Sequence, residues 1–326
     1  MRFLRRFSVW IVCAFFLLPG MPGSSLGASS DSGSGSPVSR TPLLSVEQGG
    51  MFLVFEPGGG PSRFVTFMGQ TVPLVLFHRP FFGVPAGSRI ALLGVDFSRK
   101  PGSRELVLWA KRPTGIRKHG IAIRILSRRF AVSRLTVKPG FVVPPEALLR
   151  RIRKEREEIL AALSRQTPVS FSKPFVLPVH GRITHDFGAI RILNGKTMSR
   201  HSGEDIDAPE GSPVQAANDG TVVLSGLFYY DGNMVLVDHG GGLLTEYLHM
   251  NRRLVRTGQR VVRGQTIGYV GHTGRVTGPV FHYGAVLNGQ HINPLRLSGF
   301  PGIRLDLSMG SSSLKEARRS EDSAKP

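Results

Sequence analysis

The sequence predicts a mainly β protein made of two units joined by a single helix. Short β-prone runs alternate with Gly/Pro turns along most of the chain, which has 40 glycines and 23 prolines in 326 residues. Only one long segment, 146–163, has the apolar spacing of an amphipathic helix. A chain of this length can form two domains, each with its own core.

Residues 1–27 have the features of a signal peptide. Three arginines near the start precede an apolar run of twelve residues, 7–18, and the small residues of 25–27 offer a cleavage site. A helix needs ~20 residues to span a bilayer, so cleavage is favoured over an uncleaved anchor. Cys13, the only cysteine, lies inside this segment, so the exported chain would have no disulfide. Residues 28–43 are Ser/Gly-rich and predict a flexible linker.

Residues 44–140 have the pattern of a small antiparallel β-sandwich. The β-prone runs, separated by Gly/Pro turns, are 51–55, 72–77, 90–95, 105–109 and 121–125. His78 and His119 lie here without partner residues for a site, and we expect surface or structural roles for both.

The segment 144–166 predicts a helical connector. Its apolar residues are spaced by four, seven and four positions, with charges between them: Leu148, Ile152, Ile159 and Leu163. Pro145 suits the first turn of a helix. We interpret the segment as a spacer docked between the units, with a partner-binding helix as the alternative.

Residues 175–300 predict a second β unit, in which glycines interrupt short strands every few residues. The expected strands are 222–224, 234–237, 243–249, 260–262 and 280–287. The Ser- and charge-rich tail, 308–326, predicts disorder.

The formal charge of +20 favours polyanionic partners: nucleic acid, anionic lipids or acidic wall polymers. Loss of residues 1–27 would remove three arginines and no acids, which leaves 20 − 3 = +17. The sequence has no helix-turn-helix, zinc-knuckle or RNP-like segment, so no nucleic acid is expected. The alternatives are attraction to anionic envelope polymers or lipids and a solvated basic surface.

His201 and Asp205, with His282 far downstream, are of the side-chain types that a catalytic Zn²⁺ takes as ligands, with three protein donors and one position left for water. Residues four apart share a face in a helix and in a strand alike. Gly203 and the Gly/Pro residues that follow argue against a helix. We therefore expect an extended segment with His201, Gly203 and Asp205 on one face.

The run His201-Ser202-Gly203-Glu204-Asp205-Ile206-Asp207-Ala208-Pro209 resembles the opening motif of the lysostaphin/LytM-type peptidases (peptidase family M23). Further blocks that resemble this family follow in order within about 175–297: 218–223, 232–240, 245–249, 258–268 and 271–279. The resemblance implies an antiparallel β peptidase domain, often preceded by an Ig-like domain. It also implies a zinc endopeptidase that cuts peptide cross-links of bacterial cell walls. Zinc ligation is implied for His201, Asp205 and His282, and a catalytic role for His249.

The sequence differs from the family at the motif His-x-His, where it has Val280-Phe281-His282. The missing imidazole would act with His249 as general base, and losing one proton-transfer group removes ~10²–10⁴ in rate. Three outcomes stay open: a slow enzyme that relies on His249, rescue by another imidazole such as His272, or a degenerate wall-binding protein that regulates another wall hydrolase. The retained ligand set favours the enzyme.

An alternative function would involve no metal, because residues 261–268 also resemble the hairpins of biotinyl or lipoyl carrier domains. Those domains need a lysine at an exposed turn, and no lysine occurs between Lys196 and Lys315, so this reading fails. His239 precedes two glycines in a turn, where a structural hydrogen bond is expected. No role is assigned to the remaining histidines of this unit, His180, His185 and His291.

Overall fold

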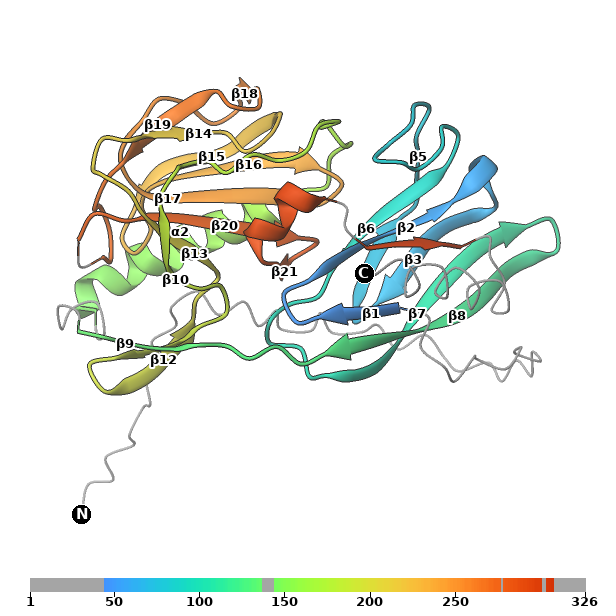
Figure 1. Cartoon of the computed structure of the whole chain (residues 1–326), viewed down its shortest axis with the longest axis horizontal. Coiled ribbons are helices and arrows are strands. Elements are labelled where there is room, and N and C mark those ends of the chain that lie inside the picture. Colours follow the sequence, from blue (N-terminus) through green and yellow to red (C-terminus); the bar gives the residue numbers. More distant parts are fainter. Residues whose placement is uncertain (1–43, 137–143, 277, 301–302, 308–326) are drawn as a thin grey trace, which may run out of the picture.

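The computed structural model describes residues 44–136, 144–276, 278–300 and 303–307, and strands dominate it (Figure 1). The prediction of a mainly β protein is therefore confirmed. The predicted signal peptide, linker and tail lie outside these residues. In the described part of the chain, no helix is both long enough and apolar enough to cross a membrane.

The first unit, on the right of Figure 1, contains two sheets with strand orders β1-β8-β7-β3-β4 and β22-β2-β6-β5. Its elements are β1 (Leu44–Glu47), β2 (Met51–Glu56), η1 (Pro57–Gly59), β3 (Ser62–Phe67), β4 (Gln70–Pro73), β5 (Val75–Leu76), β6 (Arg89–Gly94), β7 (Gly102–Arg112), β8 (Gly115–Leu126) and β22 (Ile303–Asp306). Side chains of both sheets, such as Phe52 and Ile123, share one hydrophobic cluster. Two sheets over one core agree with the predicted sandwich. The expectation of antiparallel pairing is wrong for β1 with β8 and for β2 with β22, which pair in parallel. The Ig-like type stays a prediction.

The helix α2 (Glu146–Leu163) has the bounds that its apolar spacing predicts. Pro145 precedes its first turn, where a missing N–H costs no helical hydrogen bond. Ala162 and Leu163 are buried in a cluster with residues of the second unit, and the half-buried Ile159 packs against this cluster. The helix is thus docked along one face of the second unit.

The second unit, on the left of Figure 1, is centred on a ten-stranded sheet with the main order β10-β13-β20-β17-β16-β15-β18. Its elements are β10 (Arg182–His185), β13 (Gly203–Asp207), β14 (Pro213–Gln215), β15 (Gly220–Phe228), β16 (Gly232–Gly240), β17 (Leu243–Arg253), β18 (Arg260–Val261), β19 (Thr266–Val270), β20 (Phe281–Leu287), β21 (Gln290–His291) and η2 (Pro294–Gly299). Strand β17 lies between β16 and β20, and its residues 243–250 are all buried. Its two faces belong to different hydrophobic clusters, with Tyr247 in one and Leu248 in the other, so the whole run is buried although it includes Thr245 and Glu246.

Two strands cross between the units in a way that the sequence did not predict. Strand β9 (Val132–Leu135) leaves the first unit and pairs in parallel with β11 (Ile190–Leu193), which also pairs with β12 (Lys196–Arg200). Strand β22 comes after the second unit and pairs in parallel with β2 of the first. Leu53 and Leu92 of the first unit also share a hydrophobic cluster with Tyr247 and Tyr283 of the second. The two units are therefore packed together through a common core.

Candidate active site

Two neighbouring strands bring together the three side chains that the sequence singles out. Asp205 lies in β13 directly opposite His282 in β20, because the two strands pair antiparallel in this register. His201 lies two residues before β13, and all three side chains are buried. Within the described residues, His201, Asp205 and His282 form the one group of histidines and acids whose ligand atoms lie within 4.8 Å of one another.

The donor atoms of this group converge on a single point. Asp205 Oδ1 lies 2.9 Å from His201 Nε2 and 3.0 Å from His282 Nδ1. The two imidazole nitrogens are 2.9 Å apart. Zinc–nitrogen bonds of about 2.0–2.1 Å in a tetrahedron separate donors by roughly 3.3 Å. The observed triangle needs only a slight expansion to hold such an ion, so the residues present fit zinc.

Neighbouring groups fix the orientation of these donors. The backbone carbonyl of Asp186 lies 3.2 Å from His201 Nδ1, and a hydrogen bond there leaves the Nε2 lone pair for a metal. Arg191 Nη2 donates to Asp205 Oδ2 at 2.7 Å, so Oδ1 faces the two histidines. Each side chain therefore presents one defined atom to the site.

Burial and neighbouring charge set the protonation states. Burial, with a smaller contribution from the Arg191 guanidinium, lowers the pKa of His201 to about 3 against the opposing effect of Asp205. Burial alone would raise the pKa of Asp205, but His201, a hydrogen bond from His282 and Arg191 together hold it well below its usual value. A neutral imidazole and an ionised carboxylate are the forms that bind a metal ion.

Gly203 makes room for the third donor. It pairs with Gly284 across the two strands. A Cβ on Gly203 would lie 2.6 Å from His282 Nε2 and would also meet the Tyr283 carbonyl. The glycine of this motif is therefore required by the close approach of the His282 ring to the backbone of β13.

His249 faces the same site through an unusual backbone conformation. Its φ is +63°, in the left-handed region, and its N–H donates to the Asp231 carbonyl. Regular alternation along β17 would place His249 on the same face as Tyr247. Tyr247 instead packs in the core, while the His249 ring lies 6.2 Å from the His282 ring. The local break in β17 turns His249 toward the three donors.

The His249 ring is also fixed in its plane. Its Nδ1 lies 2.9 Å from the Thr273 carbonyl, so Nδ1 carries the proton and Nε2 has the lone pair. Burial lowers the pKa of His249 to about 3, and His282 adds to this effect. His249 is therefore a neutral imidazole with one nitrogen available for a water molecule or a substrate.

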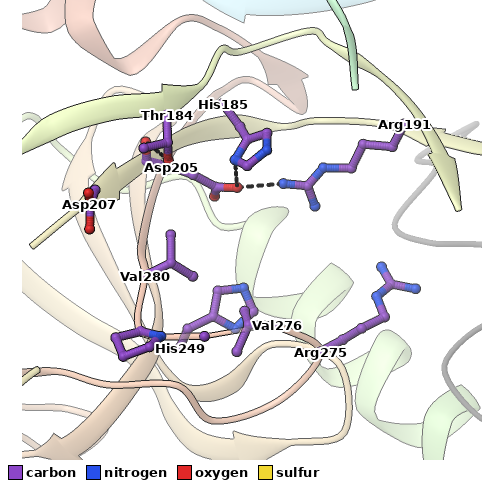
Figure 2. Close-up of a pocket in the computed structure, with 11 residues that line it drawn as sticks. Thr184, His185, Arg191, Asp205, Asp207, His249, Arg275, Val276 and Val280 are labelled. Carbon is purple, nitrogen blue, oxygen red and sulfur yellow. Dashed lines mark hydrogen bonds and ion pairs between the residues drawn. The ribbon is translucent and has the colours of Figure 1, made fainter. Parts of the chain in front are cut away.

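Two adjoining hollows open beside the donors. The larger has a volume of about 250 Å³, and Asp205, His249 and Val280 line it together with two arginines, Arg191 and Arg275. Figure 2 shows Val280 between Asp205 and His249. The smaller hollow, of about 50 Å³, lies on the His201 and His282 side.

Val280 lies just before β20, which begins at Phe281. Its N–H donates to the Gly271 carbonyl, and its side chain lines the larger hollow with Asp205 and His249. Val280 therefore faces the hollow beside Asp205, although it precedes the strand that carries His282. An apolar surface occupies the place where the resemblance implies an imidazole.

Three other histidines of the second unit differ in their distance from the site. His239 is buried between the Asp219 carbonyl and the Thr245 hydroxyl, which agrees with the structural role expected for it. His272 is exposed, lies 3.1 Å from Glu210 Oε2, and lines neither hollow. His185, to which the sequence assigned no role, lines the larger hollow, and its Nδ1 lies 3.6 Å from Asp205 Oδ2.

His185 and Arg191 were missed because their strands gave no clear signal. Strand β10 is exposed except at His185, so it lacks the alternation that marks a half-buried strand. Its pairing with β13 places His185 opposite Asp205. The proximity of His185 to the recognised motif, sixteen residues before His201, was the one available sign.

Comparison with known proteins assigns the second unit to a family. The model of peptidase family M23 matches residues 199–294. Peptidoglycan DD-endopeptidase ShyC of Vibrio cholerae is 46% identical over 115 residues, which cover 35% of this chain and 26% of that protein. Peptidoglycan DD-endopeptidase ShyA of the same organism is 44% identical over 101 residues, or 31% of this chain and 24% of that protein. The matched part thus spans about a quarter of the length of these relatives.

A solved structure of a peptidase M23 from Pseudomonas aeruginosa is similar over a longer span. It is 30% identical, and the alignment covers 77% of this chain and 94% of that chain with a TM-score of 0.59. That span is too long for the second unit alone, so the likeness includes residues of the first unit.

Proposed function

The chain belongs to peptidase family M23, and on this basis we propose that it is a zinc metalloendopeptidase that hydrolyses peptide cross-links of bacterial peptidoglycan. The observation that carries the proposal is the convergence of His201, Asp205 and His282 on one point at the edge of an open hollow. The relatives named as peptidoglycan DD-endopeptidases support the substrate class.

The proposed roles follow from the geometry. His201, Asp205 and His282 would hold a zinc ion, which supplies Lewis acidity and activates water for attack on an amide. His249, with its Nδ1 bound to the Thr273 carbonyl, presents Nε2 to the hollow. We assign to His249 the task of holding the attacking water and moving its proton.

The valine at position 280 supports a peptidase activity with a reduced rate. A second imidazole beside His249 would share proton transfer, and the methyl groups of Val280 cannot. His272 is not placed to replace it, because it lines neither hollow. We therefore propose reduced turnover, with the regulation of another wall hydrolase as a second candidate function that the same apolar substitution favours.

The proposed location is the cell envelope. The relatives are named for peptidoglycan, which lies there, and the predicted signal peptide supports export to the periplasm or envelope. The basic composition supports additional attraction to anionic envelope polymers or lipids.

A combined metal and turnover measurement tests the proposal. The purified protein should contain about one zinc per chain and should release peptides from cross-linked muropeptides. His282→Ala should lose the zinc, because it removes one of three donors, whereas His249→Ala should keep the zinc and lose turnover. Equal zinc content in wild type and His282→Ala would reject the site. A zinc-loaded protein with no turnover would favour the regulatory function.

A further inference from the structure

The turn between β7 and β8 carries a concentrated positive charge. The segment 106–145 contains nine lysines and arginines and no acid. Lys111, Arg117 and Lys118 lie next to the turn, and all three are exposed. Among the described residues, none of these three cations forms an ion pair with an acid. Their charge is therefore directed to solvent.

The tip of this hairpin extends beyond the sheet that supports it. Ala110 is the last residue of β7 that pairs with β3, and β1 pairs with β8 only from Ile123 onward. The strand residues of the tip, 111–112 and 115–117, pair only with each other. In Figure 1 the turn lies at the right-hand end of the molecule, away from the second unit. The tip thus projects on the side opposite the candidate active site.

The outer face of the hairpin combines cations with apolar groups. Lys111 lies opposite Ile116, and Trp109 lies opposite Lys118, so these four side chains share one face. Leu108 points to the other face, into the core of the first unit. Ile116 is 69% exposed, and Lys118 Nζ lies 4.4 Å from the centre of the half-buried Trp109 ring. The hairpin therefore presents an isoleucine, a tryptophan and two lysines together.

This combination favours a lipid surface over an anionic polymer. Lysine stems cover apolar surface while their ammonium groups reach charged headgroups. Tryptophan is enriched at the boundary between membrane and water, and an exposed apolar side chain gains free energy when acyl chains cover it. An acidic wall polymer would neutralise the lysines, but it has no apolar layer for Ile116 to enter.

We propose that the tip of the β7–β8 hairpin binds the surface of a membrane that contains anionic lipids. Lys111, Arg117 and Lys118 contact the headgroups, and Ile116 enters the apolar layer beneath them. This inference goes beyond the proposed peptidase activity, because it uses no residue of the candidate active site. A protein held in this way would keep its second unit turned from the membrane toward the wall.

Cosedimentation with lipid vesicles tests the proposal. The chain is used without residues 1–27, because the apolar run 7–18 would itself bind lipid. It should bind vesicles of phosphatidylglycerol and phosphatidylcholine, but not vesicles of phosphatidylcholine alone. Lys111→Gln/Lys118→Gln should weaken binding about 30-fold, since each cation near an anionic membrane contributes about 5-fold. Ile116→Ser should weaken it about 10-fold, because less apolar area would be covered.

Two matched variants control for net charge and for exposed apolar area. Lys100→Gln/Lys154→Gln removes the same charge from two exposed lysines, one before β7 and one on α2. Leu227→Ser removes an apolar side chain that is 59% exposed on β15. Both variants should retain the wild-type binding to vesicles. Circular dichroism checks that every variant has the wild-type fold.

Three outcomes would overturn the proposal. An equal loss of binding in the two lysine pairs would show that net charge, and not the hairpin, decides binding. Unchanged binding of Ile116→Ser would show that no side chain of the tip enters the bilayer. The same variants are also tested on purified anionic wall polymer without lipid. If Lys111→Gln/Lys118→Gln weakens that binding and leaves vesicle binding unchanged, the hairpin is a polymer-binding surface instead.

Discussion

Val280 is the residue whose side chain most directly limits the proposed chemistry. It lines the hollow between Asp205 and His249 and offers only methyl groups there. Val280→His would add an imidazole to the hollow. We expect it to raise muropeptide cleavage by one or more powers of ten, within the ~10²–10⁴ range of general-base catalysis.

The double variant Val280→His/His249→Ala is the control for this gain. If the two imidazoles share proton transfer, the gain should disappear in the double variant. A variant with bound zinc, an unchanged fold and no gain would contradict the weakened-peptidase interpretation. It would favour a regulatory role.

Gly203 allows a second test at the scale of one residue. A Cβ at this position would lie 2.6 Å from His282 Nε2, so Gly203→Ala should push the His282 ring away from Asp205. Changes around metal ligands typically cost 10–100-fold in metal affinity, and we expect a loss of this size in a chelator-competition titration. Gly299→Ala is the matched control, because a Cβ there meets no atom within 4 Å. Equal zinc affinity in both variants would show that the His282 ring does not depend on this gap.

The sequence was sufficient to single out the three side chains that converge, but not their surroundings. His201, Asp205 and His282 belong to ordered motifs, and the pairing of β13 with β20 brings them together as the resemblance implies. The orientation of His249 could not be predicted, because its positive φ depends on contacts with Asp231 and Thr273. Such contacts are tertiary and leave no trace in local spacing.

At the scale of elements, β17 carries a buried acid that makes stability depend on pH. Burial raises the pKa of Glu246 to about 8, and Asp231 adds to this effect. Gly284 on the neighbouring strand makes room for the carboxyl, because a Cβ there would meet Glu246 Oε2. The folded protein therefore keeps the proton between pH 4.5 and about 8, where the unfolded chain has lost it.

The titration of Glu246 makes the folded protein less stable as the pH rises. The stabilising contribution of the bound proton is present below pH 4.5 and is lost through about pH 8. Glu246→Gln removes the titration, so its stability relative to wild type should rise by up to about 5 kcal/mol between pH 4 and pH 9. Urea unfolding at both pH values measures it, with Glu157→Gln, exposed on α2, as the control. A constant difference between Glu246→Gln and wild type would contradict the buried proton.

Elements with strong internal patterns were predicted better than elements defined by a distant partner. The helix α2 matches its apolar spacing from the first residue to the last. The buried strands β2, β6, β15, β16 and β17 coincide with apolar runs. Strands β9 and β11 have no comparable run. The partner of β9 is β11, which pairs with both β9 and β12. Pairing over such a distance cannot be read from either segment alone.

For the whole molecule, the positive charge predicts how the protein is retained on its substrate. The formal charge is +20, and charges on the surface are screened within about 10 Å at 0.1 M salt. Binding to purified anionic wall material should therefore weaken steeply as salt rises. Cosedimentation at low and high salt measures this, with wall stripped of its anionic polymers as the control. Retention that does not change with salt would reject an electrostatic contribution.

The parallel pairing of β22 with β2 also constrains the order of folding. Leu305 in β22 is buried in the hydrophobic cluster of the first unit, about 250 residues away from β2 along the chain. During synthesis, β2 is made about 250 residues before β22 and lacks this neighbour over that whole interval. Contacts between such distant segments form late, because the loop that they close is long. The first unit therefore cannot be completed before the second unit has been synthesised, and until then its open strand edge needs protection from pairing with other chains.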